Sequence, residues 1–358
     1  MPTDQLTDAP FLNLADPTFS VQSDAVRQAR EASWFAHTSY GLAVLRYDEV
    51  SKLMKDRRLR QGSWAWPAHN GVHDGPFAHW WTSALLNLEG DDHHRLRRLM
   101  NPAFSPKLIG GLVPRFQALA NELIDDFHER GRCDFASEFA EPYAARVIAI
   151  MLGIPEGEWK KIAAWSNDIG LALGVTLAQD LAKVEAALEG LYEYADELIA
   201  DRRTNPGDDF VSRLVLAERD GEHLSHDELR VSLVLLIFGG MDPTVTWVTR
   251  EALEDFEYQG LEIKAGTTIH LLSESAGTDP RVIEGEPFDL TAQRAPHFGF
   301  GGGAHHCLGH FVARSDMSEA LPLLAQRLKN PTIDGIATWL PLSGNTGPIF
   351  LPIAFERG

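Results

Sequence analysis

Hydrophobic and polar residues follow two periods along this chain, and the helical period dominates. Residues 42–47 have the pattern of a short strand that leads into a helix from Asp48. Residues 91–219 are mainly helical in pattern, with interruptions at prolines and glycines. The alternation over residues 256–272, around Gly260 and Gly266, predicts a β-ribbon. We therefore expect a mainly α fold with small β-sheets.

Two segments depart from this amphipathic pattern. Ser225 and Glu228 have the spacing of a capping box, which predicts the start of a helix. Residues 231–241 are apolar on all sides, so this helix is expected to run through the protein centre. It is too short to span a bilayer. Residues 61–88 are rich in Gly, Pro, Trp and His without a sustained period, which predicts a long flexible loop on the substrate side. Because no Pro/Ser linker divides the chain, we predict a single domain over residues 1–358.

Composition narrows the class of protein. Hydrophobic residues make up 44% and charged residues 23% of the chain, as in an ordinary globular protein. The net charge of −19 argues against nucleic acid or an anionic membrane as a partner. The first residues show no basic region before a long apolar run, so we expect neither a signal peptide nor an anchor and predict a cytoplasmic protein. The only two cysteines, Cys133 and Cys307, exclude a disulfide framework.

The most informative segment is FGGGAHHCLG, residues 300–309. Three consecutive glycines leave room for a large flat ligand against the backbone. Cys307 is expected at the N-terminus of a helix that starts with Leu308, where the helix dipole and free amides stabilise a thiolate. Gly309 leaves room for a bulky group above the first turn. A thiolate held in this way is a natural axial ligand for haem iron, and its electron donation favours O–O cleavage.

Three other interpretations of the segment are weaker. A phosphate cradle would need a strand–GxGxxG–helix unit around the glycines, and the sequence has none. A zinc site is conceivable by ligand type, but adjacent ligands do not converge easily on one ion; its candidates are His305, His306, Cys307 and His310. A buried structural cysteine leaves the flanking glycines unexplained. Haem ligation accounts for both features.

The same segment, followed by HFVAR, resembles the haem-binding loop of the cytochrome P-450 family. The resemblance runs from the N-terminal strand to the closing LPLSGNTGPIFLPIAF and implies the mainly α, triangular P-450 fold with small β-sheets. It implies that haem b is bound by the loop residues Phe300, Gly301, His305, Cys307 and Gly309. Cys307 is the expected iron ligand, and Cys133 is expected to be an inert, partly buried thiol.

Basic residues elsewhere match family positions that approach the haem propionates. The resemblance implies this role for His93, Arg97, Arg250 and His305. His93 and Arg97 stand four apart, on one helical face. We expect nitrogen atoms of the four residues about 2.7–3.2 Å from the carboxylates. Arg95 and Arg98 are expected to be solvated or to bind acids of helices, and His297 is expected to be structural.

The central apolar helix matches the family helix that passes over the oxygen-binding face of haem. There Gly239 and Gly240 open a groove, and Asp242 with Thr244 would form the acid–Thr pair that relays protons to bound dioxygen. The family has Thr directly after the acid. This chain has Pro243, which in a helix interior would remove an amide and clash with the preceding turn.

Family members continue this helix and add two more, the last with a Glu-x-x-Arg pair, before the strand that carries Arg250. This chain has no room for them, and about 40 residues are absent at mean helix length. Either the polypeptide lacks these helices, or a stretch is omitted between Asp242 and Pro243. Omission is favoured, because their loss would expose apolar surface in a protein whose total stability is about 5–15 kcal/mol. A normal Cα–Cα distance of about 3.8 Å across this junction, with an intact site, would contradict omission.

The resemblance implies a haem-thiolate monooxygenase that inserts one oxygen atom of O₂ into a small apolar organic substrate. Electrons would come from a ferredoxin- or flavodoxin-type donor docking on the Cys307 side. The alternative is a haem-binding protein with little or no turnover, because the Glu/Arg pair and the relay Thr are missing. One further set of large apolar residues has two explanations, an apolar substrate pocket or simple core packing. The set consists of Trp64, Trp66, Trp80 and Trp81 with Phe238 and Met241.

Overall fold

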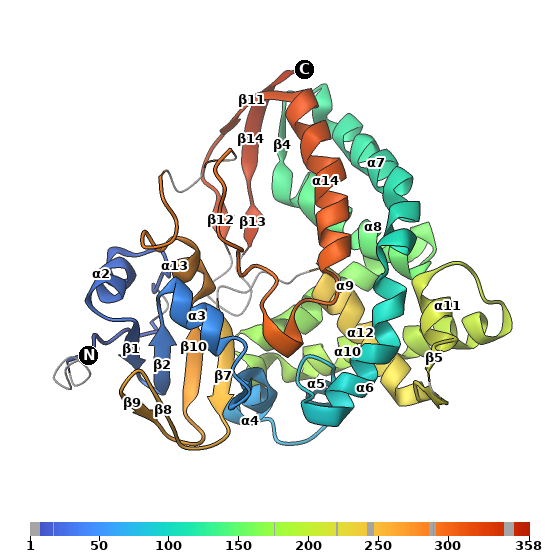
Figure 1. The fold of residues 1–358 in the computed structure, drawn as a ribbon. Coiled ribbons are helices and arrows are strands. Elements are labelled where there is room, and N and C mark those ends of the chain that lie inside the picture. Colours follow the sequence, from blue (N-terminus) through green and yellow to red (C-terminus); the bar gives the residue numbers. More distant parts are fainter. Residues whose placement is uncertain are drawn as a thin grey trace. The chain divides into compact units, whose positions relative to one another are not determined.

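The computed structural model describes residues 8–16, 18–174, 176–219, 221–241, 247–285, 289, 291–339 and 347–358. Contacts between Cα atoms divide the chain into two compact units. The first comprises Met1–Trp66 and Thr244–Cys307, and the second comprises Pro67–Pro243 and Leu308–Gly358. Figure 1 labels helices and strands in both units where there is room. This division into units does not test the predicted single domain, which stays a prediction.

The first unit is built on a five-stranded mixed sheet with the strand order β1-β2-β10-β7-β3. Its strands are β1 (Phe35–Thr38), β2 (Gly41–Val44), β3 (Leu59–Gln61), β7 (Val248–Ala252) and β10 (Thr268–Leu271). Strand β10 runs parallel to β2 and antiparallel to β7. The other elements are α2 (Asp24–Ala32), α3 (Tyr47–Leu53), η1 (Gly62–Ala65), the hairpin of β8 (Phe256–Tyr258) and β9 (Leu261–Ile263), α13 (Ser273–Gly277) and η6 (Gly303–His305). The predicted β-ribbon is confirmed.

Strand β2 is buried on both faces, which explains its uninterrupted apolar sequence. Leu42 and Val44 belong to one core cluster, and Ala43 belongs to another with Leu45, which follows the strand. Because side chains alternate along a strand, this division places the two clusters on opposite faces of the sheet. The sheet is therefore an internal layer of the first unit.

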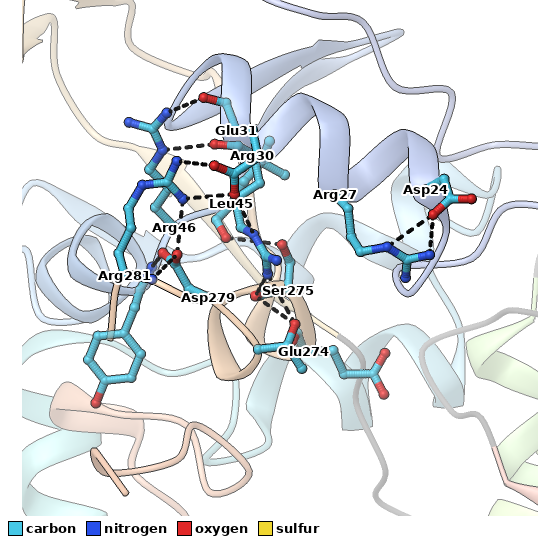
Figure 2. Close-up of polar contacts among 12 residues, drawn as sticks. Asp24, Arg27, Arg30, Glu31, Leu45, Arg46, Glu274, Ser275, Asp279 and Arg281 are labelled. Atoms are coloured by element: carbon cyan, nitrogen blue, oxygen red, sulfur yellow. Dashed lines mark hydrogen bonds and ion pairs between the residues drawn. The ribbon is translucent and has the colours of Figure 1, made fainter. Parts of the chain in front are cut away.

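A set of buried charges ties α13 and the turn after it to the rest of this unit (Figure 2). Arg30 is only 4% exposed and donates to the Ser275 carbonyl. Asp279 is 1% exposed and accepts hydrogen bonds from the Tyr47 N–H at 3.0 Å and the Arg281 guanidinium at 3.0 Å. Burial raises the pKa of the Asp279 carboxyl, but these bonds outweigh burial and hold that pKa below its ordinary value. Asp279 is thus ionised at neutral pH and fixes the start of α3.

The second unit is mainly helical. Its helices are α4 (Trp66–His69, which begins on the last residue of the first unit), α5 (Pro76–Ser83), α6 (Gly90–Met100), η2 (Asn101–Phe104), α7 (Pro106–His128), the π-helix η3 (Ala136–Ala140), α8 (Glu141–Leu152), η4 (Glu156–Glu158), α9 (Trp159–Gly170), η5 (Leu171–Leu173), α10 (Leu177–Thr204), α11 (Phe210–Val215), α12 (His226–Met241) and α14 (His310–Arg327). Its strands are β4 (Arg132–Asp134), β5 (Glu218–Arg219), β6 (Glu222–His223), β11 (Leu328–Ile333), β12 (Thr338–Trp339), β13 (Pro348–Phe350) and β14 (Pro352–Arg357). They form a sheet in the order β11-β14-β4 and the pairs β5-β6 and β12-β13.

Helix α12 is the predicted central helix, and it packs against α8, α9 and α10. Its capping box is confirmed. The Ser225 N–H donates to Glu228 Oε2 at 2.8 Å, and the Glu228 N–H donates to Ser225 Oγ at 3.2 Å. Within the described part of the chain, no helix combines the length and apolar character needed to cross a membrane.

We expect Ser225→Ala to lower the free energy of unfolding by about 1 kcal/mol, because it removes the side-chain acceptor at the start of α12. Ser105 is a matched control. It occupies the same position before α7, but its side chain makes no capping hydrogen bond there. Urea denaturation of Ser225→Ala and Ser105→Ala would compare the two, and equal losses would contradict the capping role of Ser225.

The predicted loop over residues 61–88 contains secondary structure. Helix α5 starts after Gly75, whose φ is +97°, and has Pro76 in its first turn. Phe77, Trp80 and Trp81 are buried along this helix. The spacing of three and four residues is helical, but eight residues are too few to show a sustained period in the sequence. Pro76–Ser83 is therefore a helix and not part of a loop, whereas the predicted flexibility of the segment stays a prediction.

Part of the aromatic set packs in the core. Trp80 is fully buried, and its ring meets that of Phe238 edge to face with centroids 5.9 Å apart. Trp64 lies in the first unit, where its Nε1–H donates to Glu251 at 3.0 Å and the Arg60 guanidinium covers its ring. Core packing therefore explains Trp80, and a polar contact explains Trp64.

Candidate active site

The cysteine loop, defined here as residues 296–307, is folded back on itself before Cys307. The Cys307 N–H donates to the Phe300 carbonyl at 2.9 Å, and the Gly301 N–H donates to the Phe298 carbonyl at 2.8 Å. Gly301 and Gly303 have φ values of +64° and +71°, in the left-handed region that favours glycine. The backbone therefore presents Cys307 from a closed turn, and the thiol is half-buried and forms no disulfide.

The three glycines of the loop have different surroundings. A Cβ on Gly301 would meet only the His305 carbonyl oxygen, at 3.8 Å. A Cβ on Gly302 would lie 2.9 Å from Met54 Sδ, and one on Gly303 would lie 2.7 Å from the Met54 carbonyl oxygen. Gly301 is therefore the least crowded of the three glycines, and room for a ligand beside it stays a prediction. The other two glycines allow the loop to pack closely on Met54.

Helix α14 begins at His310, with Gly309 as its N-cap residue. The sequence placed its start at Leu308, directly after Cys307. The first helical hydrogen bond runs from the Ala313 N–H to the Gly309 carbonyl at 3.1 Å, so the helix begins three residues after Cys307. The other cysteine, Cys133, lies on β4 and is 7% exposed, and burial raises its thiol pKa to about 12. A thiol with that pKa is protonated at neutral pH, as expected for an inert cysteine.

Arg250 is the predicted propionate ligand on the sheet of the first unit. It lies on β7 between Ile269 of β10 and Gln61 of β3. Its side chain donates to the Gln61 side chain and to the Thr249 carbonyl, and the residue is only 4% exposed. A guanidinium desolvated to this degree is well suited to bind a carboxylate. His305, the other candidate in this unit, is half-buried in η6.

Helix α6 carries the two candidates of the second unit. His93 is 2% exposed and Arg97 is half-buried, four residues further along the same helix. Arg95 forms an ion pair with Glu228 on the first turn of α12, so α6 is tied to the central helix. The prediction that Arg95 binds a helix acid is confirmed, whereas Arg98 pairs with Glu222 of strand β6.

The two glycines that are predicted to open a groove on α12 have different surroundings. A Cβ on Gly239 would meet no atom within 4 Å. A Cβ on Gly240 would lie 2.2 Å from Ile148 Cδ1 of α8, so this glycine serves helix packing. Asp242 and Thr244, the predicted proton relay, and the junction with Pro243 lie outside the described residues.

We expect Gly240→Ala to be less stable than Gly239→Ala by about 1–3 kcal/mol, because only the former forces a methyl group into a packed contact. Ile148→Ala removes both clashing atoms, Cδ1 and Cγ1, so most of this difference should disappear in that background. Thermal or denaturant unfolding of the double-mutant cycle would measure the coupling. A Gly240→Ala cost that is unchanged by Ile148→Ala would contradict the assignment.

The sequence also allowed a zinc site around the loop. Over the residues that the structure describes, no group of three or more His, Cys, Asp or Glu is placed to hold a metal ion. That interpretation therefore has no support there. His297 has a local role, because its Nδ1 accepts the Gly299 N–H at 3.1 Å.

Comparisons with known proteins decide the family. The family model described as cytochrome P-450 matches residues 243–345, which include the cysteine loop. Luteothin monooxygenase from Streptomyces thioluteus is 34% identical over 97% of this chain and 96% of its own length. The chain belongs to the cytochrome P-450 family. Its relatives also include the mycinamicin IV hydroxylase/epoxidase of Micromonospora griseorubida, 28% identical over 87% of this chain and 89% of that protein.

The fold of this P-450 is confirmed by solved structures. The crystal structure of CalO2 superposes with a TM-score of 0.84 and 25% identity, over 95% of this chain and 99% of that one. Relatives named as monooxygenases and hydroxylases support a monooxygenase, an oxidoreductase with a haem-iron cofactor, and nothing supports the alternative without turnover. P-450 monooxygenases in general use an organic substrate, O₂ and a redox partner.

One alignment also contains positions that this chain lacks. The alignment with luteothin monooxygenase spans 393 positions and exceeds the 358 residues of this chain by 35. At least that many positions of the relative therefore have no residue opposite them here. This number is close to the length of about 40 residues expected from the absent helices.

Proposed function

We propose that Cys307 is the thiolate ligand of a haem b iron in this P-450. The residues of the first unit suit such a group: Cys307 is a half-buried thiol on a closed turn, and Gly301 is the least crowded glycine of the same loop. Cys133 is the poorer ligand, because burial keeps its thiol protonated. Phe300, Gly301 and Gly309 complete the loop part of the binding site.

Four basic residues would hold the haem propionates: His93, Arg97, Arg250 and His305. The near-complete burial of His93 and Arg250 supports this role, since a buried cation or histidine is stabilised by a nearby anion. Because arginine stays charged at neutral pH, Arg97 and Arg250 would be stronger anchors than the two histidines. Gly239 on α12 would leave space on the oxygen side.

The reaction we propose is insertion of one oxygen atom of O₂ into an apolar organic molecule. Bound haem supplies the activation of O₂ in this chemistry. The protein's own residues would hold the group, exclude water, and deliver protons through Asp242 and Thr244. The polyketide biosynthesis P-450 PksS of Bacillus subtilis is 29% identical over 83% of this chain, which makes polyketide-type molecules the first substrates to test. A ferredoxin- or flavodoxin-type protein would donate the electrons.

The cysteine loop is the observation that carries this proposal. The chain that contains it is 34% identical to a monooxygenase over 97% of its residues. Its test is turnover of a panel of polyketide-type substrates under ¹⁸O₂, with a ferredoxin and its reductase. We expect a product that carries one ¹⁸O atom. Haem bound normally, without product from O₂ or from peroxide, would instead identify a haem-binding protein without turnover.

A further inference from the structure

We propose that helix α3, together with Met54 directly after it, is the element that positions the cysteine loop for iron ligation. This inference rests on the proposed role of Cys307 as the haem ligand. The helix contacts the loop at two places, before and after the turn that contains Phe300. Tyr47 and Met54 are therefore positioning residues, which act on Cys307 through the backbone of the loop.

The first contact is made by Tyr47, the first residue of α3. Its hydroxyl donates to the Pro296 carbonyl at 2.7 Å, and its ring packs against that of Phe298 with centroids 4.7 Å apart. Tyr47 is only 9% exposed, so little water competes for its hydroxyl. Phe298 in turn accepts the Gly301 N–H, which starts the closed turn. Tyr47 thus fixes the residues from which the turn is built.

The second contact is made by Met54. Its side chain lies against Gly302 and its carbonyl against Gly303, so close that neither glycine could carry a Cβ without a shift. Gly303 is also the first residue of the short helix η6, and the chain continues from the C-terminal end of this helix to Cys307. Met54 is 4% exposed and belongs to the core cluster of the first unit, so it cannot move away freely.

Helix α3 is itself held rigidly. Val50 and Leu53 are completely buried in the same core cluster as Met54. The N–H of Tyr47 donates to the buried carboxylate of Asp279 at 3.0 Å. A loop that must hold a ligand atom to within a fraction of an ångström of its binding position needs support from packed helices or strands. The contacts with α3 therefore restrict the loop before any haem binds.

The first test removes one hydrogen bond and keeps the ring. In Tyr47→Phe, hydrogen exchange of the loop amides, above all those of Gly301 and Cys307, should accelerate on the order of fivefold in protein purified without haem. Tyr40→Phe is the matched control, because it removes the same atom from a half-exposed tyrosine that packs on His270 of the same sheet. It should leave exchange in the loop unchanged.

The second test compares two glycines with similar φ. In Gly301→Ala, the only cost is the strain of an alanine in the left-handed backbone region. Gly303→Ala has the same strain and, in addition, a collision of the new Cβ with the Met54 carbonyl. Gly303→Ala should therefore loosen the loop by a further tenfold or more in exchange rate. After haem is added, Tyr47→Phe and Gly303→Ala should lower the fraction of reduced protein with a thiolate-type carbon monoxide spectrum.

Two results would overturn the proposal. In the first, the loop amides of Tyr47→Phe exchange no faster than those of Tyr40→Phe. In the second, the loop amides of Gly303→Ala exchange no faster than those of Gly301→Ala. Both comparisons use protein without haem, so they decide the role of α3 whether or not Cys307 binds iron. Failure of the proposed function would appear separately, as a wild-type protein that gives no thiolate-type spectrum.

Discussion

Replacing Cys307 with alanine should abolish the thiolate-type carbon monoxide spectrum and all turnover of the haem-loaded enzyme. The sulfur is the only atom of this residue that can bind iron, and the closed turn presents it through backbone bonds that alanine retains. The loop itself should stay folded, because neither its glycines nor its contacts with Tyr47 and Met54 change. Haem content, the reduced carbon monoxide spectrum and product formation together measure the effect.

Cys133→Ala is the control for this variant. Cys133 is buried on β4, and the high pKa of its thiol keeps it protonated. This substitution should leave the spectrum and turnover in place and change only the stability of the second unit, slightly. If the thiolate-type spectrum survives Cys307→Ala, or is lost in Cys133→Ala, the ligand is assigned to the wrong residue.

Asp279→Asn should lower the free energy of unfolding at pH 7 by about 3 kcal/mol, because it breaks a buried charge-assisted cluster. The carboxylate accepts the N–H groups of Tyr47 and Arg281 and the Arg281 guanidinium (Figure 2). An asparagine amide would place a donor against at least one of these donors. Chemical denaturation at a series of pH values would measure the loss.

The pH dependence separates this effect from a packing defect. The pKa of Asp279 is lower in the folded state than in the unfolded chain, because the hydrogen bonds outweigh the effect of burial. Its contribution is therefore complete above the unfolded value, about 4, and is lost as the pH falls through the lower folded value. The difference between wild type and Asp279→Asn should shrink below about pH 4.

Asp255→Asn is the matched control for Asp279→Asn. Asp255 also accepts a backbone N–H, from Ala265, and pairs with a cation, Lys264. Its side chain is 58% exposed, so solvent screens these bonds and the substitution should have a much smaller effect. Equal losses for the two variants, or an Asp279 effect that does not change with pH, would contradict the account of the cluster.

Elements with a long local pattern could be predicted from the sequence. The apolar run of α12, its capping box at Ser225 and Glu228, and the β-ribbon were predictable because their residues specify them through near neighbours. The cysteine loop was visible for the same reason, since its glycines and Cys307 lie within ten residues. Helix α5 was missed because its stripe of Phe77, Trp80 and Trp81 is only two turns long.

Contacts between distant segments could not be predicted. The glycine run predicts room for a ligand, but Gly302 and Gly303 pack closely on Met54, and nothing in the local sequence connects them with this much earlier residue. Tyr47 was unremarked in the sequence for the same reason, although it bonds to Pro296. Gly239 and Gly240 are adjacent and identical, and only the position of Ile148 separates their roles. In each case a tertiary contact, absent from the local pattern, decides the function of a residue.

The central claim is that this chain is a P-450 whose Cys307 thiolate binds haem iron. The carbon monoxide difference spectrum of the reduced, purified wild-type protein tests it most directly, because it reports haem and its thiolate ligand in one measurement. We predict a thiolate-type spectrum. A haem protein whose carbon monoxide spectrum shows no thiolate ligation, or a protein that takes up no haem, would contradict the claim.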